Sequence, residues 1–195
     1  KGINRAYDIF IKSDTWAALE EYIGGVLDNI PEEGRVGIPI HGLIREIGLS
    51  IEDDGSILRA ATRKGVPIFS PGFLDSMIGI PLWMYSKRKK LVINPIKDFD
   101  LLGEMVYDAR KSGAIILGGG TPKHHTQYMN TLREGLDAAV QISSARVEDG
   151  SLSGAPLKEA ISWGKLKEGK TSTIFGDVTI VFPLIVAAAL EKING

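Results

Sequence analysis

The sequence predicts an α/β fold: a Rossmann-like central parallel sheet flanked by helices, organised as one α/β domain over residues 1–195. Short apolar runs alternate with amphipathic segments of helical period, which is the pattern of parallel strands joined by crossover helices. The run 114–117 is wholly apolar, as in a central strand, and leads directly into three glycines. With 195 residues, 44% of them hydrophobic, the chain can bury a core of its own.

The elements are expected in alternation along the chain. Helices are predicted over residues 14–29, 40–47 and 55–64, from the loop at 70–72 to about 86, and over 95–111 and 122–134. Strands are predicted over residues 66–69, 91–93, 114–117, 138–142 and 173–175. Residues 143–162 have little periodicity, and an irregular segment of that length in a compact domain is usually functional. The apolar stretch 178–190 predicts a buried terminal helix, since it is shorter than the ~20 residues of a membrane span.

Composition narrows the classes of function. The net charge of −1 gives no global attraction to nucleic acid or to an anionic membrane, so neither partner is expected. Cysteine is absent, which excludes disulfides, thiol chemistry and thiolate metal sites. We expect a soluble, cytoplasmic protein. Because the chain begins with Lys1 and not with methionine, we also expect it to be a piece of a longer polypeptide.

The first constellation is the glycine run Gly118–Gly120 between a predicted strand and a predicted helix. Such a turn lets phosphates approach backbone N–H groups at a helix N-terminus, although a plain strand-to-helix turn would have the same sequence. Lys123, His124 and His125 follow in the first helical turn. Adjacent histidines diverge on a helix, so at most one of them faces the site, and no ligand partner at suitable spacing indicates a metal.

The second constellation is the tetrapeptide Ser162–Lys165, of sequence SWGK. A lysine is nucleophilic only as the free amine, and burial against the indole of Trp163 would lower its pKa. The alternative is a buried tryptophan beside a surface lysine.

A third segment, residues 148–155 with Glu159 beyond it, sets acidic side chains among glycines. This composition suits recognition of hydroxyls and amines, and it equally suits an ordinary surface loop.

Together these segments resemble the deoxyhypusine synthase family. The resemblance is carried by VPIFSPGFLDSMIG, GGGTPKHHTQ, GLDAAVQISSA, EDGSLSGAPLKEAISWGK and FGDVTIVFPLIVAAAL, in order and spacing from about residue 7 to residue 190. It implies the family's NAD- and spermidine-binding fold. It also implies that NAD takes a hydride from spermidine and that an enzyme lysine captures the aminobutyl group as an imine. The group then passes to one lysine of the precursor of the hypusine-containing translation factor, with reduction of the new imine.

The resemblance also implies residue roles. Lys165 matches the covalent lysine, His124 the residue at the reacting amine, Trp163 the aromatic wall beside spermidine, and Glu159 a carboxylate that holds a terminal ammonium. Nine further residues match NAD-contacting positions: Asp75, Gly119, Gly120, Ser143, Ser144, Ala145, Asp149, Gly176 and Asp177.

Two departures keep other functions open. Eukaryotic members carry aspartates where Ile80 and Leu152 stand, and both aspartates touch spermidine there. One alternative is homospermidine synthase-like transfer to a small diamine, and another is a non-catalytic subunit that activates a complete paralogue. The family's chains are longer, so we expect the missing N-terminal half to take part, in the same or a separate chain. By resemblance we also expect a homo- or hetero-oligomer, a tetramer with sites at a dimer interface.

Overall fold

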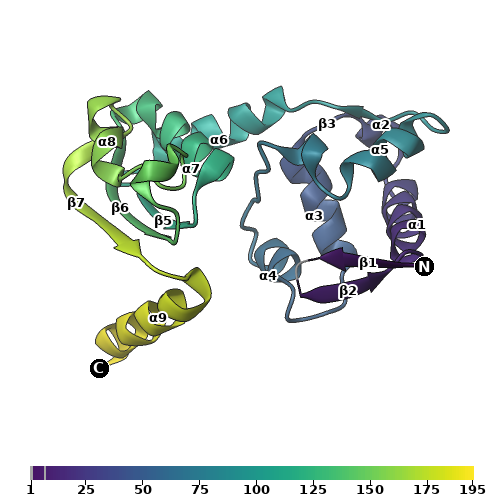
Figure 1. Cartoon of the computed structure of the whole chain (residues 1–195). Coiled ribbons are helices and arrows are strands. Elements are labelled where there is room, and N and C mark those ends of the chain that lie inside the picture. The colour runs from purple at the N-terminus through teal and green to yellow at the C-terminus, as the bar shows by residue number, and fades with distance from the viewer. Residues whose placement is uncertain (1, 7) are drawn as a thin grey trace. The chain divides into compact units, whose positions relative to one another are not determined.

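The computed structural model describes residues 2–6 and 8–195, which form two compact units, Lys1–Asp100 and Leu101–Gly195 (Figure 1). The boundary falls inside helix α6 (Ile96–Asp108), and each unit is described by itself. The single α/β domain expected over residues 1–195 stays a prediction.

The first unit is mainly helical, with two small pairs of strands. Its elements are β1 (Ile3–Ala6), β2 (Ile9–Lys12), α1 (Thr15–Asp28), α2 (Glu32–Arg35), β3 (Val36–Ile38), α3 (Ile40–Ser50), α4 (Ile57–Arg63), the 3-10 helix η1 (Phe73–Asp75), α5 (Gly79–Ser86) and β4 (Val92–Ile93). Strands β1 and β2 form an antiparallel pair, whereas β3 and β4 pair in parallel.

The core of this unit lies between α1, α3 and α5. Apolar side chains at helical spacing on α1 and α3 are buried, because each helix turns one stripe inward. They are Ile23, Val26, Leu27, Ile40, Leu43, Ile44 and Ile47, joined by Leu82 and Tyr85 of α5. The helices predicted at 14–29, 40–47 and 55–64 therefore correspond to α1, α3 and α4.

The second unit carries a parallel sheet. Its elements are β5 (Gly113–Leu117), α7 (Gly120–Met129), the 3-10 helix η2 (Asn130–Arg133), β6 (Leu136–Ser143), the 3-10 helix η3 (Val147–Asp149), α8 (Leu157–Ser162), β7 (Leu166–Phe175) and α9 (Val178–Asn194). Strand β6 lies between β5 and β7, and both pairings are parallel. Leu157 and Ala160 of α8 are buried with Leu136, Ala139 and Leu166 of the sheet. The α/β class and the parallel sheets flanked by helices are thus confirmed.

Three expectations about elements were wrong. The strand at 114–117, expected at the centre of the sheet, is β5, which lies at an edge in the described part of the second unit, with Ile115 68% exposed. Residues 66–69 form no strand, since Pro67 lacks an N–H for a ladder. Helix α9 has no buried residue. An apolar sequence favours burial of a helix, but it does not supply the surface against which the helix would pack.

Candidate active site

The carboxyl ends of the three strands of the second unit meet at one edge of the sheet (Figure 1). The backbone N–H of Gly118 donates to the carbonyl of Ile142 at 2.8 Å, and that of Gly176 donates to the carbonyl of Ser143 at 3.1 Å. Parallel α/β sheets bind ligands just outside the carboxyl ends of their strands, so a cofactor is expected at this edge. The structure brings to it the predicted cofactor residues that directly end or follow strands, namely Gly119, Gly120, Ser143, Ser144, Ala145, Gly176 and Asp177.

The glycine turn depends on glycine for two different reasons. Gly118 and Gly120 adopt φ of 78° and 71°, in the left-handed region that side chains disfavour. A Cβ on Gly119 would lie 2.5 Å from the Cα of Ser153, so the turn is also packed tightly against the segment that precedes α8. Helix α7 begins at Gly120, and its first N–H groups lack partners within the helix. The turn therefore has the geometry of an anion-binding site.

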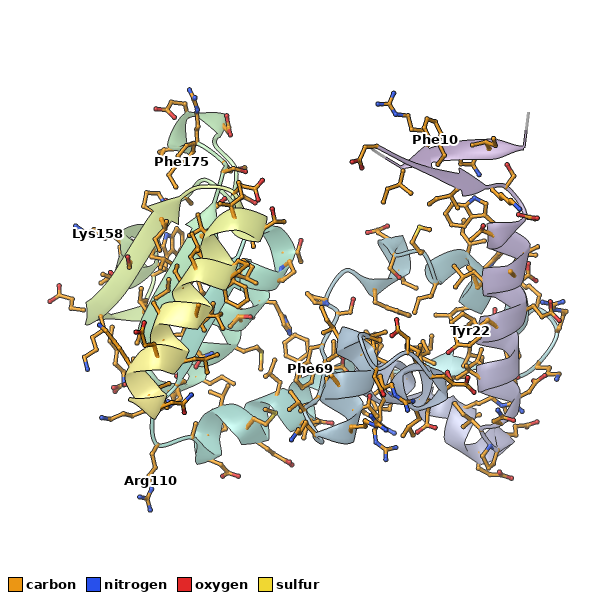
Figure 2. All side chains as sticks on the ribbon, turned by 90° about the horizontal axis from the view of Figure 1, so that it is seen from below. Phe10, Tyr22, Phe69, Arg110, Lys158 and Phe175 are labelled. Carbon is orange, nitrogen blue, oxygen red and sulfur yellow. The ribbon has the colours of Figure 1, made fainter. Side chains whose placement is uncertain are left out.

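A groove of about 400 Å³ lies beside this edge. Among the predicted residues, Ser143 and Ala145 line it, together with Arg146, Val147, Glu148, Ser153, Gly154, Pro156, Thr173 and Phe175. Phe175, at the end of β7, is 65% exposed and labelled in Figure 2. The volume is within the ordinary range for a small-molecule site.

Two predicted cofactor carboxylates also have local structural roles. Asp149 accepts a hydrogen bond from the backbone N–H of Arg146 at 3.0 Å, which closes the turn at η3. Asp177 caps α9 by accepting from the backbone N–H of Thr179 at 2.7 Å, and the hydrogen bonds from Thr179 lower the pKa of Asp177. Asp75 belongs to the first unit, where it is exposed in η1.

The SWGK segment follows α8 and enters β7. The ammonium of Lys165 lies 5.4 Å from the centre of the Trp163 ring, in a cation–π arrangement. Lys165 is half-buried, but Trp163 is 68% exposed. Within this unit the indole of Trp163 therefore does not bury Lys165 as expected. Trp163 follows Ser162, the last residue of α8, and lies at the C-terminal end of that helix.

The backbone of Lys165 is fixed more tightly than its side chain. Its N–H donates to the carbonyl of Ala160 at 3.0 Å, and its carbonyl accepts from the N–H of Leu136 at 3.1 Å. Gly135, with φ of 92°, approaches so closely that a Cβ there would lie 2.7 Å from the carbonyl carbon of Lys165. This contact is possible only with glycine.

Lys165 and the glycine turn lie at opposite ends of the strands: Lys165 at the amino ends and the glycine turn at the carboxyl ends. Lys165 precedes β7 at the level of Leu136, whereas the turn follows β5 at the level of Ile142. The six residue steps along β6 from Leu136 to Ile142 separate these levels by about 20 Å at ~3.3 Å per residue. Helix α7 returns the chain from one edge towards the other, and His124 lies on it.

Lys123, by contrast, has no free donor. It is 5% exposed, and its ammonium donates to the side-chain oxygen of Gln141 at 3.0 Å and to the carbonyls of Leu152 at 2.9 Å and Ala155 at 2.6 Å. Burial lowers the pKa of Lys123, while the charge of Glu159 acts in the opposite direction. All three N–H groups of the ammonium are engaged, so the partly exposed Lys165 is better placed than Lys123 to attack a substrate.

The remaining predicted residues are exposed. His124 stacks on Tyr128 with ring centres 5.8 Å apart, and Glu159 lies on α8. Sequence reasoning missed Gln141, which is fully buried in β6 and bonded to both the glycine turn and Ser153. The available signal was an amide among the apolar residues of a predicted strand.

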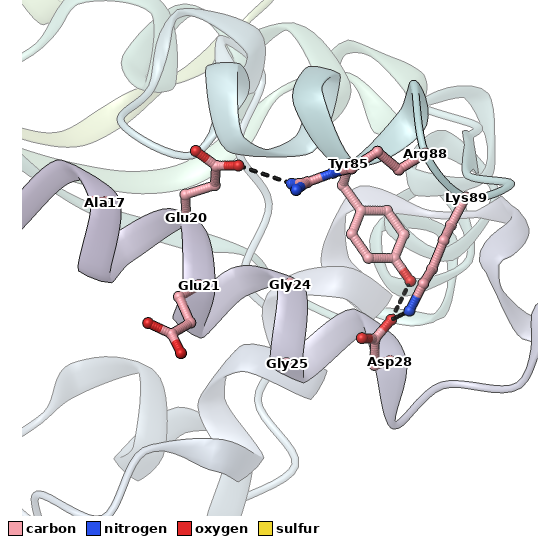
Figure 3. Close-up of a pocket in the computed structure, with 9 residues that line it drawn as sticks. All are labelled: Ala17, Glu20, Glu21, Gly24, Gly25, Asp28, Tyr85, Arg88 and Lys89. Carbon is pink, nitrogen blue, oxygen red and sulfur yellow. Dashed lines mark hydrogen bonds and ion pairs between the residues drawn. The ribbon is translucent and has the colours of Figure 1, made fainter.

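A second groove, of about 570 Å³, lies in the first unit between α1 and the segment after α5 (Figure 3). Its opposing charges already pair across it: Arg88 with Glu20 at 2.7 Å, and Lys89 with Asp28 at 2.6 Å. These pairs make it a structural contact between two segments rather than a second candidate site.

Within residues 2–6 and 8–195, no group of three or more His, Cys, Asp or Glu side chains is arranged to hold a metal ion. None of the helices in this part of the chain has both the length and the apolar character needed to cross a membrane.

The fold and the site define a class: an α/β protein with a glycine turn at the carboxyl edge of a parallel sheet. The chain belongs to the deoxyhypusine synthase family, whose family model matches residues 1–189. It is 44% identical to a "probable deoxyhypusine synthase" of Methanothermobacter thermautotrophicus over 99% of this chain, and 40% identical to one of Picrophilus torridus over 97% of it. These matches cover 63% and 62% of the two relatives, so the chain spans less than two thirds of their length.

The fold has a match among solved structures as well. A crystal structure from Entamoeba histolytica, assigned to the same family, aligns with a TM-score of 0.61 at 19% sequence identity. The alignment covers 90% of this chain and 54% of that one, and it supports the fold.

Proposed function

We propose that this chain supplies the catalytic lysine for NAD-dependent transfer of the aminobutyl group of spermidine to a lysine of the hypusine-containing translation factor precursor. The observation that carries the proposal is the contrast between two lysines. Lys165 is partly exposed beside an aromatic ring on a tightly held backbone, whereas Lys123 has every donor engaged. Family membership provides the reaction class.

The carboxyl edge of the sheet fits part of a dinucleotide. The N-terminus of α7 and the left-handed glycines suit a pyrophosphate, and the adjoining groove begins at Ser143 and Ala145. We assign NAD to this edge, held by Gly119, Gly120, Ser143, Ser144, Ala145, Asp149, Gly176 and Asp177; the family resemblance makes Asp75 a further predicted cofactor contact. When bound, NAD would supply a hydride acceptor for spermidine and return that hydride to the product.

The role of Lys165 is exchange of amines. Its neutral amine adds to the imine carbon of oxidised spermidine, the bond from that carbon to the nitrogen of 1,3-diaminopropane breaks, and a proton moves to the leaving amine. The acceptor lysine then displaces Lys165 in the same way, which regenerates the free enzyme amine. Such covalent catalysis requires a lysine that loses its proton in the working site, and a cationic substrate nearby favours that loss.

The neighbouring side chains suit a polyamine. Trp163 offers an exposed ring face to an ammonium, an interaction worth roughly 0.5–2 kcal/mol. Glu159 on α8 offers a carboxylate six residues before the lysine, and His124 offers a proton acceptor at the reacting amine. Because the carbon that gives up the hydride is also the carbon that Lys165 attacks, and Lys165 lies about 20 Å from the glycine turn of its own chain, we propose that the two come together at the expected dimer interface.

We further propose that the active protein is a cytoplasmic oligomer that includes the polypeptide corresponding to the rest of its relatives' length, in the same or a separate chain. The chain spans less than two thirds of those relatives, and α9 and one face of β5 present apolar side chains such as Ile115 and Leu184 to solvent. Exposed apolar surface of this kind is typical of an interface.

A second candidate is homospermidine synthase-like transfer to a small diamine. It is favoured by Ile80 and Leu152, which are 69% and 48% exposed where eukaryotic members carry aspartates. Loss of two carboxylates removes charge complementarity for a terminal ammonium.

The test is to incubate the complete protein with NAD and spermidine, adding either the factor precursor or a diamine. We expect release of 1,3-diaminopropane and a mass gain of one aminobutyl group on the precursor, both absent in Lys165→Ala. Transfer to the diamine alone would select the second candidate. No diaminopropane with either acceptor would overturn both and leave a non-catalytic subunit.

A further inference from the structure

A fully buried amide lies in the middle of the central strand of the second unit. Gln141 is 0% exposed and stands in β6 between Val140 and Ile142. Its side-chain nitrogen donates to the carbonyl of Gly118 at 3.0 Å and to that of Ser153 at 2.9 Å. One side chain therefore holds both the glycine turn and the segment that lies against it.

A buried cation completes the arrangement from the other side. The ammonium of Lys123, on the first turns of α7, donates to the side-chain oxygen of Gln141 at 3.0 Å. Its two other bonds go to the carbonyls of Leu152 and Ala155, on either side of Ser153. All but one of the hydrogen bonds that Lys123 and Gln141 donate go to backbone carbonyl oxygens. Those from Lys123 come from a charged donor, and such hydrogen bonds are stronger than those between neutral groups.

The segment that these bonds hold forms part of the groove wall. Ser153 and Gly154 line the groove, and Gly119 approaches the Cα of Ser153 so closely that only glycine fits. Gly154 is equally constrained, because a Cβ there would lie 2.0 Å from the carbonyl oxygen of Arg146 on the same wall. Residues 152–155 connect η3 to α8 without belonging to either element. Apart from the turn bonds that Gly154 and Ala155 donate to Ser151, the bonds from Lys123 and Gln141 are what hold them.

We propose that Lys123 and Gln141 are positioning residues that lock residues 152–155 over the glycine turn and thereby set the shape of the dinucleotide groove. This inference rests on the proposed function in one respect, the nature of the ligand. Neither residue touches that ligand. They act through Ser153 and its neighbours, so their loss weakens cofactor binding by freeing the wall and not by removing a contact.

The experiment uses Lys123→Met and Gln141→Leu in the complete protein, with Gln141→Glu as an isosteric variant. A carboxylate at position 141 still accepts from Lys123, but it cannot donate to Gly118 and Ser153 and faces their oxygens instead. Two matched controls are available: Lys158→Met on the exposed side of α8 (Figure 2), and Gln127→Leu on α7, whose side-chain nitrogen has no hydrogen-bond partner among the described residues.

Two measurements are made on each protein: amide hydrogen exchange without ligand, and calorimetric titration with NAD. We expect faster exchange across residues 146–155 and at least about tenfold weaker NAD binding in the Lys123 and Gln141 variants. The controls should match the wild type in both. If Lys123→Met or Gln141→Leu fails to fold, Gln141→Glu decides on the same two measurements.

The outcomes separate this inference from the proposed function. Wild-type exchange in residues 146–155 of the Gln141 variants would overturn the lock, whatever binds in the groove. Faster exchange with unchanged NAD affinity would overturn its role in shaping the cofactor site. If the wild-type complete protein binds no NAD, the assignment of the cofactor fails, and the exchange measurement still decides whether the lock exists.

Discussion

At the scale of single residues, the two adjacent histidines of α7 separate into different environments. His124 is exposed and stacked on Tyr128, whereas His125 is half-buried. Neighbouring side chains on a helix diverge by about 100°, so one site can use only one of them. We predict that His124→Ala lowers the rate of aminobutyl transfer by at least about a hundredfold, the lower end of what general acid–base catalysis contributes, while His125→Ala leaves it close to wild type.

The comparison is made at saturating NAD and spermidine, with thermal unfolding recorded for both variants. A larger loss of rate in His125→Ala, with its stability intact, would show that the roles are reversed.

Leu152 offers a second test with a defined direction. Its side chain is 48% exposed, so a carboxylate there need not be buried, and its backbone is held by Lys123. We predict that Leu152→Asp tightens spermidine binding by about ten- to a hundredfold, since a charge-assisted hydrogen bond contributes roughly 1.5–3 kcal/mol. Leu152→Asn is the matched control because it has the same shape without the charge. Equal affinity in the two variants would mean that the ammonium does not reach this loop.

Residue chemistry was only partly predictable from the sequence. The types and order of Lys165, Trp163, Glu159 and His124 indicate the family, but they do not predict how exposed these side chains are. Trp163 is far more exposed than its sequence context suggested. The connection from Lys123 through Gln141 to Ser153 could not be foreseen, because it joins α7, β6 and a loop that meet only in the folded sheet.

At the scale of elements, the entry into β7 depends on Gly135. A Cβ at this position would lie 2.6 Å from the backbone nitrogen of Leu166, and its φ of 92° already disfavours a side chain. We predict that Gly135→Ala displaces Lys165 and lowers the transfer rate by ten- to a hundredfold, the order of loss that a misplacement of ~1 Å can cause. The affinity for NAD should stay near wild type, since the glycine turn lies at the other edge of the sheet.

The control is Gly150→Ala, which has a similar left-handed φ of 63° but no atom within 4 Å of the added Cβ. Rates and NAD affinities are measured for both variants. An equal loss of rate in the two would mean that backbone strain, and not the approach to Lys165, is responsible.

Helices were predicted better than sheet membership. Amphipathic period and capping residues lie within one segment, so α1, α3 and α4 were found close to their true ends. Strand pairing joins distant segments, and the sequence could not reveal that β4 pairs with β3 or that β6 and not β5 lies at the centre. The length of β7 was also missed. This strand is largely exposed, and its charged residues Lys167, Glu168 and Lys170 interrupt the apolar pattern by which strands were predicted.

At the scale of the whole molecule, the chain presents only part of a cofactor site. The glycine turn and its groove provide one wall. The acidic residue at the spacing of about twenty residues that a Rossmann ribose contact would use is Asp137, but it lies at the amino end of β6 and pairs with Lys167 at 3.0 Å. We predict that the chain alone binds NAD weakly and gains at least about tenfold in affinity when the polypeptide matching the rest of its relatives is added. Calorimetry on the chain and on the mixture checks this, and tight binding unchanged by mixing would mean that the partner is unnecessary.

The central claim is that Lys165 carries the aminobutyl group. The most direct measurement is to treat the complete protein, with NAD and spermidine present, with borohydride, and to map the reduced adduct by mass spectrometry. Lys123 and Lys167 serve as internal comparisons, because the first is buried with its donors engaged and the second pairs with Asp137 at 3.0 Å. The account predicts a single aminobutyl adduct on Lys165 that disappears when NAD is omitted. An adduct on Lys123 or Lys167, with Lys165 unmodified, would contradict it.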